Sequence, residues 1–164
     1  GEIAYAPRTE NYHYEMELVF ALKSGGTKIT EADALSHIYG CAAGLDMTRR
    51  DLQNKAKENR KPWDTSKDVD ESAVITPLRQ MSEVPSVASG RIHLSQNGTV
   101  KQDADLSEMV WSVPEIIADL STMYTLQQGD VIYMGTPAGV GAVSRGDVLA
   151  GGVEGIGDFE VKIA

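Results

Sequence analysis

Two glutamates, Glu15 and Glu17, stand just before an apolar run, LVFAL, at residues 18–22. Side chains alternate between the two faces of a β-strand, so both carboxylates lie on one face, together with His13. If this strand lies at an exposed edge, water solvates the carboxylates. If it enters a core, the like charges repel and lose hydration unless a cation neutralises them. The second alternative predicts a site for a hard divalent cation, because Mg²⁺, Mn²⁺ and Ca²⁺ prefer carboxylate oxygens.

Asp46 is a third carboxylate that fits such a site. It ends the small, apolar stretch 38–46, which predicts a strand, and it precedes a helix that we expect to start after an N-cap at Thr48. Functional side chains often project where a strand meets a loop. Asp46 could therefore join Glu15 and Glu17 around one cation and leave positions for water and substrate. The alternative is an ordinary acidic residue near a helix N-terminus.

Turn and cap residues divide the rest of the chain into short strands and helices. Helices are expected at 31–37, at 49–59 and from Ser112 to about 124, the last with Pro114 in its first turn. Asn97 and Gly98 predict the turn of a hairpin spanning 92–100. Further strands are expected at 73–78, 131–134, 147–149 and 158–163, with an extended lead-in at 1–12 and a polar loop at 61–70. Because short strands dominate, the predicted fold class is β-rich α+β.

Composition limits the classes of partner. The 164 residues suit one domain with a sizeable core, and the net charge of −9 argues against a nucleic-acid or anionic-membrane partner. No apolar run is long enough to span a bilayer, and no signal peptide is visible. The single cysteine, Cys41, excludes an internal disulfide and is typical of a reducing compartment, so we expect a cytoplasmic protein. In its apolar surroundings Cys41 is expected to be unreactive.

Other candidate residues are cationic or lie in a glycine-rich stretch. Arg50 and Gln53 are three residues apart and share one helix face, where Arg50 could bind a substrate carboxylate or simply face solvent. Lys67 could neutralise an enolate or carry a proton. The stretch GTPAGVG at 135–141 lacks the Lys-Ser/Thr ending of a P-loop, so we reject nucleotide binding. Its backbone N–H groups and the Thr136 hydroxyl could instead approach a small anionic ligand.

Four segments in this order, HYEMEL at 13–18, GLDMTRRDLQ at 44–53, KPW…K at 61–67 and QGDVIYMGTPAGVG at 128–141, resemble the fumarylacetoacetate hydrolase family. The resemblance implies a mixed β-sandwich roll, usually assembled as a homodimer. It also implies Mg²⁺ or Mn²⁺ as cofactor, with Ca²⁺ possible in crystals. The implied site residues are the metal ligands Glu15, Glu17 and Asp46, the catalytic Lys67, and the substrate-binding Arg50, Gln53 and Thr136.

The activity that the resemblance implies is hydrolysis of a carbon–carbon bond in a 2,4-dioxo acid. Within the family the motifs look most like the acylpyruvate branch, which implies conversion of fumarylpyruvate to fumarate and pyruvate in aromatic catabolism. Oxaloacetate decarboxylation and isomerisation of 2-hydroxyhepta-2,4-diene-1,7-dioate remain alternatives, as does a metal-binding dimerisation domain without turnover. Family members also carry an N-terminal lid segment with a His-Glu pair. We expect residues 1–164 to form a single metal-binding catalytic domain without that segment.

Overall fold

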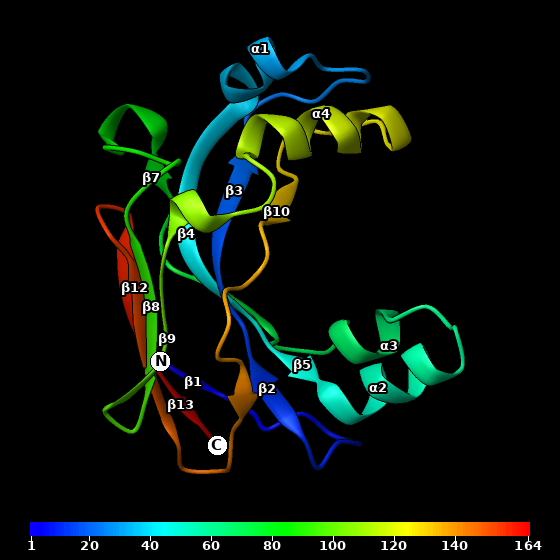
Figure 1. Ribbon diagram of the computed structural model, residues 1–164, viewed down its shortest axis with the longest axis vertical. Coiled ribbons are helices and arrows are strands. Elements are labelled where there is room, and N and C mark those ends of the chain that lie inside the picture. Colours follow the sequence, from blue (N-terminus) through cyan, green and yellow to red (C-terminus); the bar gives the residue numbers. More distant parts are fainter.

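A computed structural model describes residues 1–164, and its strands form three sheets (Figure 1). The first sheet has the order β1 (Glu2–Ile3), β13 (Gly157–Ile163), β12 (Val148–Val153), β8 (Arg91–Gln96) and β9 (Thr99–Asp105). The second has the order β10 (Val131–Tyr133), β3 (Met16–Leu22), β4 (Ile38–Asp46) and β6 (Ala73–Ile75), and β7 (Arg79–Gln80) also pairs with β4. The third consists of β11 (Gly141–Ala142), β2 (Tyr12–Tyr14) and β5 (Thr48–Arg49).

The helices lie in two groups at different ends of the strands (Figure 1). Helix α1 (Glu31–Ala34), with the 3₁₀ turn η1 (Leu35–His37), lies beside α4 (Val113–Met123) at the upper end of β3 and β4. Helices α2 (Arg50–Glu58) and α3 (Asp64–Lys67) contact each other beyond the lower end of β4. Two further 3₁₀ turns are η2 (Met81–Glu83) and η3 (Leu106–Glu108). None of the helices is long and apolar enough to cross a membrane.

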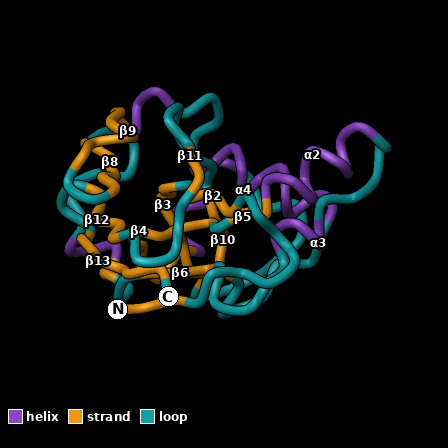
Figure 2. Tube along the Cα trace, turned by 90° about the horizontal axis from the view of Figure 1, so that it is seen from below, coloured by secondary structure: helices purple, strands orange, loops and turns teal.

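The main core lies between the first and second sheets. One cluster of buried apolar side chains includes Leu94 and Leu149 from the first sheet and Leu18 and Phe20 from the second. Viewed along the strands, the sheets curl around this interior while α2 and α3 extend to one side (Figure 2). The fold class is therefore β-rich α+β with curled sheets, as the short strands and their turns predict.

Strand β3 is central to this arrangement, not an exposed edge strand. It pairs with β10 on one side and with β4 on the other, and every residue from Met16 to Leu22 is buried. Residue Gly44 of β4 faces Glu17 across the pair, and a Cβ atom at Gly44 would lie only 2.7 Å from Cγ2 of Val19. The small residues of β4 thus allow the close packing expected from the sequence. Because β3 enters the core, the carboxylate of Glu17 and that of Glu15 just before the strand need a partner of opposite charge.

Several predicted caps and turns are confirmed. Ser112 caps α4 in a reciprocal capping box with Glu115, and Pro114 lies in the first turn. Asn97 and Gly98 have φ angles of 52° and 78°, as the tight turn of the β8–β9 hairpin requires. The strands of this hairpin extend further than expected and contain a register shift between Leu94 and Ser95.

Two local predictions are wrong. Thr48 does not cap α2, because it lies in β5 and Arg49 occupies the N-cap position without a side-chain cap. The Thr48 hydroxyl donates instead to the backbone oxygen of Asp46 at 3.1 Å. The expected polar loop at 61–70 contains the helical turn α3, whose last residue is Lys67. In both segments, tertiary contacts with the strand ends determine the secondary structure, because neither segment has a strong local preference for helix or strand.

Candidate active site

Three carboxylates converge where β3 begins and β4 ends. Glu15 lies immediately before β3, Glu17 lies within it, and Asp46 is the last residue of β4. The two strands are antiparallel, so the end of one lies beside the start of the other, and the backbone N–H of Asp46 donates to the backbone oxygen of Glu15 at 2.9 Å. One ligand oxygen from each carboxylate lies within 4.8 Å of the others. The structure thus brings together the three residues expected to bind a metal.

Burial makes this cluster costly without a cation. Glu15 is 7% exposed and Glu17 is 3% exposed, while Asp46 is partly buried. Burial raises the pKa of Glu17 to about 7; the backbone N–H of Gly135 opposes the shift, and the negative charges of Asp46 and Glu15 add to it. Burial also raises the pKa of Asp46, although Lys67 opposes the shift. The three carboxylates offer only oxygen ligands, are negatively charged and are largely buried. Such a set of ligands fits a hard divalent cation such as Mg²⁺ or Mn²⁺.

Two cationic side chains already contact the cluster. The Lys67 ammonium donates to Glu15 at 2.7 Å, to the Thr48 hydroxyl at 2.8 Å and to the carboxylate of Asp46. Burial alone would lower the pKa of Lys67, but its hydrogen bonds to Asp46 and Glu15 outweigh that effect and raise it. The guanidinium of Arg50 donates to the other oxygen of Glu15. Lys67 therefore stays protonated, and Glu15 has a cation on each of its oxygens.

Helix α2 positions Arg50 and Gln53 against the cluster. The two residues are three apart on one helix face, and Nη1 of Arg50 donates to Oε1 of Gln53 at 2.6 Å. Gln53 is only 2% exposed, so it is not part of a solvated helix surface. Gln53 thus holds the Arg50 guanidinium in the orientation that reaches Glu15. The structure places both residues at the site, with Arg50 engaged by groups of the protein itself.

The glycine-rich stretch 135–141, which follows β10, borders the acidic cluster. The backbone N–H of Gly135 donates to Oε2 of Glu17 at 2.7 Å, so this segment contacts the acidic cluster directly. The Thr136 hydroxyl next to it accepts a hydrogen bond from Nε2 of Gln102 at 2.8 Å. The sequence predicts that backbone N–H groups of this stretch approach a small anionic ligand, and that stays a prediction, because the anion that the Gly135 N–H contacts is Glu17 of the protein itself.

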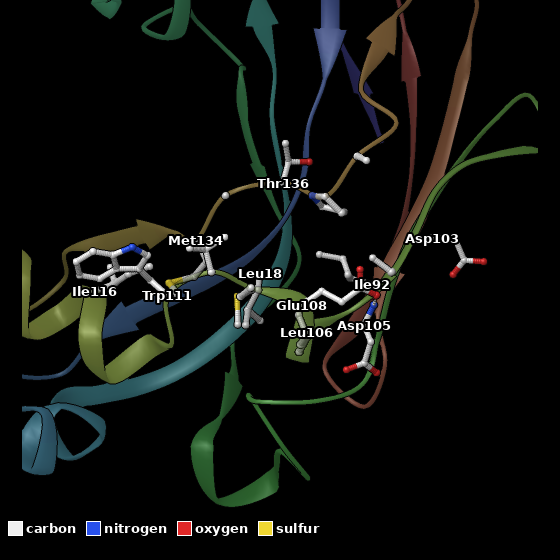
Figure 3. Close-up of a pocket in the computed structure, with 16 residues that line it drawn as sticks. Leu18, Ile92, Asp103, Asp105, Leu106, Glu108, Trp111, Ile116, Met134 and Thr136 are labelled. Atoms are coloured by element: carbon white, nitrogen blue, oxygen red, sulfur yellow. Dashed lines mark hydrogen bonds between the residues drawn. The ribbon is translucent and has the colours of Figure 1, made fainter.

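A cavity of about 480 Å³ adjoins this stretch (Figure 3). Gly135 and Thr136 form part of its wall, and apolar side chains from β3, β8, η3 and α4 form most of the rest, including Leu18, Ile92 and Ile116. Gly135 belongs both to the cavity wall and to the hydrogen bond with Glu17. A mostly apolar hollow with a few polar groups is the usual form of a small-molecule site.

Two groups at the site were not among the site residues expected from the sequence. They are the hydroxyl of Thr48, which accepts from Lys67, and the side chain of Gln102. Thr48 is two residues after Asp46, so its position beside a strand-end carboxylate was the only available signal. Gln102 lies beyond the predicted hairpin, and no motif points to it.

Comparisons with known proteins found similar sequences over almost the whole of this chain. The family model for the C-terminal domain of fumarylacetoacetate hydrolase matches residues 1–164. A fumarylpyruvate hydrolase of Ralstonia sp. is 52% identical over 161 residues, which cover 98% of this chain and 83% of that protein. The mitochondrial oxaloacetate tautomerase FAHD1 of Rattus norvegicus is 34% identical, over 98% of this chain and 76% of that protein.

A solved structure is also very similar. The crystal structure of a fumarylpyruvate hydrolase from Pseudomonas aeruginosa, in complex with Mn²⁺ and pyruvate, superposes with a TM-score of 0.97 at 43% sequence identity. The match covers 99% of this chain and 70% of that one. The strand-rich, curled fold is thus shared along almost the whole of this chain.

Proposed function

This chain belongs to the fumarylacetoacetate hydrolase family, and on that premise we propose that it is a divalent-metal-dependent hydrolase of acylpyruvates, with fumarylpyruvate as substrate. The observation that carries the proposal is the buried cluster of Glu15, Glu17 and Asp46, with Lys67 bonded to two of them. The relatives named fumarylpyruvate hydrolase support the substrate, and the Mn²⁺ and pyruvate bound by one of them support the metal and one product.

Glu15, Glu17 and Asp46 would hold the metal. When bound, a divalent cation supplies Lewis acidity and positive charge for the carboxylate and 2-oxo group of the substrate. In the overall reaction, water adds its oxygen to C4, the C3–C4 bond breaks, and C3 takes up a proton. The products are pyruvate and, from the fumaryl group, fumarate.

The residues of the chain have separable roles in this reaction. The Lys67 ammonium, whose pKa is raised, supplies a fixed positive charge where negative charge develops on the departing pyruvate portion. Arg50 neutralises Glu15, and Gln53 holds Arg50 in place. The Thr136 hydroxyl can donate to a substrate oxygen. The apolar cavity beside Thr136 excludes water from one side of the bound acid.

The direct test is the loss of the ultraviolet absorbance of fumarylpyruvate. Absorbance should fall with Mg²⁺ or Mn²⁺ present and should not fall after a chelator is added. The matched variants are Asp46→Asn and Asp119→Asn, because Asp119 is an exposed residue of α4. Asp46→Asn should abolish turnover and Asp119→Asn should leave it unchanged. Activity that survives both chelation and Asp46→Asn would refute the proposal.

A second candidate function is suggested by the relatives named oxaloacetate tautomerase, which are 32–34% identical to this chain. Tautomerisation of a 2-oxo acid needs the same stabilisation of an enolate but no attack by water. The tautomerase and the hydrolase functions are distinguished by the rates at which the protein converts enol oxaloacetate and fumarylpyruvate at equal concentrations. Faster conversion of oxaloacetate than of fumarylpyruvate would favour the second function.

We also propose Mg²⁺ as the metal in the cell, a homodimer and a cytoplasmic location. The oxygen-only ligand set supports Mg²⁺ as well as Mn²⁺. The family resemblance supports the dimer, and the single buried cysteine supports a reducing compartment. Metal analysis of the purified protein, sedimentation analysis and cell fractionation test the three in turn.

A further inference from the structure

Gln102 of β9 joins two segments of the site that are far apart in the sequence. Its side chain is completely buried, with an exposed fraction of 0%. Its Oε1 accepts from the backbone N–H of Met16, the residue between Glu15 and Glu17, at 3.1 Å. Its Nε2 donates to the Thr136 hydroxyl at 2.8 Å and to the backbone oxygen of Pro137 at 2.9 Å.

These partners leave only one orientation for the Gln102 amide. The N–H of Met16 can only donate, so it must face the amide oxygen, and the carbonyl of Pro137 can only accept, so it must face the amide nitrogen. The two protons on Nε2 are then used by Pro137 and Thr136. The Thr136 oxygen is therefore an acceptor toward Gln102, and its own proton points elsewhere. No acceptor within the protein takes that proton.

We propose that Gln102 is a positioning residue that orients the Thr136 hydroxyl as a hydrogen-bond donor toward a bound ligand, a role that rests on the function proposed above. The ligand atom that receives the Thr136 proton is then an acceptor, such as a carboxylate or carbonyl oxygen. A ligand donor could meet only the second lone pair of the Thr136 oxygen, because Gln102 occupies the first. The residue thus contributes to selection of oxo acids without touching them.

The glycine-rich stretch is held against Gln102 by a second contact. Gly139 has a φ angle of 101°, and a Cβ atom there would lie 2.1 Å from the backbone oxygen of Lys101 and 3.3 Å from Cγ of Gln102. Only a residue without a side chain permits this approach. The stretch that carries Thr136 therefore rests directly on β9 at Gly139, and the hydrogen bond from Gln102 holds the Thr136 hydroxyl.

A double-mutant cycle between Gln102 and Thr136 tests the proposal. Gln102→Met keeps the side-chain volume and removes the amide, and Thr136→Val removes the hydroxyl. Each should lower kcat/KM for fumarylpyruvate, and the affinity of the Mn²⁺-loaded protein for pyruvate, by about tenfold or more. The double variant should be within about twofold of Thr136→Val, because Gln102 acts through that hydroxyl. Thr136→Ser, which keeps the hydroxyl, should restore most of the affinity.

Gln96→Met is the matched control. Gln96 lies in the neighbouring strand β8 and donates to the backbone oxygen of Ala142 at 3.0 Å and to Asp147 at 2.7 Å. Its loss should lower stability without changing pyruvate affinity. If Gln102→Met does not fold, Gln102→Asn, which keeps the amide but cannot span both segments, replaces it in the cycle.

The outcomes separate this inference from the proposed function. Effects that multiply in the double variant, or a Gln102→Met affinity no lower than that of Gln96→Met, would overturn the role of Gln102 while leaving hydrolysis intact. A wild-type protein that binds pyruvate but hydrolyses no acylpyruvate would overturn the function, and a coupled loss of pyruvate binding would still support Gln102. Absence of both pyruvate binding and acylpyruvate hydrolysis in the Mn²⁺-loaded wild type would overturn both.

Discussion

The ammonium nitrogen of Lys67 lies 2.7 Å from Oε2 of Glu15, a residue 52 positions earlier in the chain, and it bonds the carboxylate of Asp46 as well. The helical turn α3 carries Lys67 to a point between the two strand ends. A cation of the protein therefore bridges two of the three carboxylates that are proposed to hold the metal. Metal binding and the position of Lys67 are consequently linked.

Lys67→Met should separate metal binding from turnover. The variant removes a positive charge that competes for the oxygens of Glu15 and Asp46, so the affinity for Mn²⁺ should stay the same or rise. Turnover of fumarylpyruvate should fall about 100-fold, because a fixed charge near the developing anion is lost. Titration calorimetry measures the affinity for Mn²⁺, and the absorbance assay measures the turnover of fumarylpyruvate.

Lys162→Met is the control, since Lys162 makes only an exposed ion pair with Glu2 at 3.3 Å. It should change neither quantity. Loss of Mn²⁺ affinity in Lys67→Met would contradict the role assigned to Lys67.

Divalent metal should stabilise the folded chain. At a Mn²⁺ concentration about 100 times Kd, binding adds about 2.7 kcal/mol to the free energy of unfolding. For a chain of 164 residues this corresponds to a rise in Tm of about 5–10 °C. Glu17→Gln and Asp46→Asn should lose most of that rise, whereas the exposed Asp119→Asn should keep it. An equal rise in all four proteins by calorimetry would place the metal elsewhere.

The Cys41 thiol should be unreactive in the native protein. Cys41 is 0% exposed, and burial raises its pKa to about 11, although the charge of Arg79 opposes the shift. A thiol with that pKa is about one part in 1,000 thiolate at pH 8, and thiolate is the reactive form. An aromatic disulfide reagent should therefore label one thiol per chain only after unfolding in guanidinium. Rapid labelling without denaturant would show that β4 opens or that the thiolate is stabilised.

Ser112→Ala should destabilise the fold without affecting the site. Ser112 and Glu115 form the capping box of α4, and the Ser112 hydroxyl donates to Glu115 at 2.6 Å. Loss of an N-cap costs about 1 kcal/mol, which lowers the Tm of a chain of this size by about 2–4 °C. The exposed Ser107→Ala, outside this box, should stay within about 1 °C of the wild type. Unchanged Tm in Ser112→Ala, or a change in Mn²⁺ affinity, would contradict this assignment.

The strand and turn elements follow from local patterns in the sequence. The apolar run of β3, the Asn97–Gly98 turn and the Ser112 cap each depend on neighbouring residues and elementary backbone preferences. For that reason the fold class and most element positions agree with the structure. The proposed metal ligands and Lys67 were reached through family motifs as well as through the chemistry of carboxylates.

Register and long-range contacts depend on the tertiary structure alone. A bulge between Leu94 and Ser95 shifts the hairpin by one residue, so Gln102, not Lys101, pairs with Leu94 and points into the protein. A one-residue slip moves every later side chain to the opposite face, and no local signal predicts where the bulge falls. The sequence by itself determined the buried strand that carries Glu17, with Glu15 just before it, and the strand that ends at Asp46. Only the folded chain decided that Lys67 bonds both Glu15 and Asp46 and that Gln102 bonds the Met16 N–H between the two glutamates. Those contacts join segments whose separation in sequence carries no information about their distance in space.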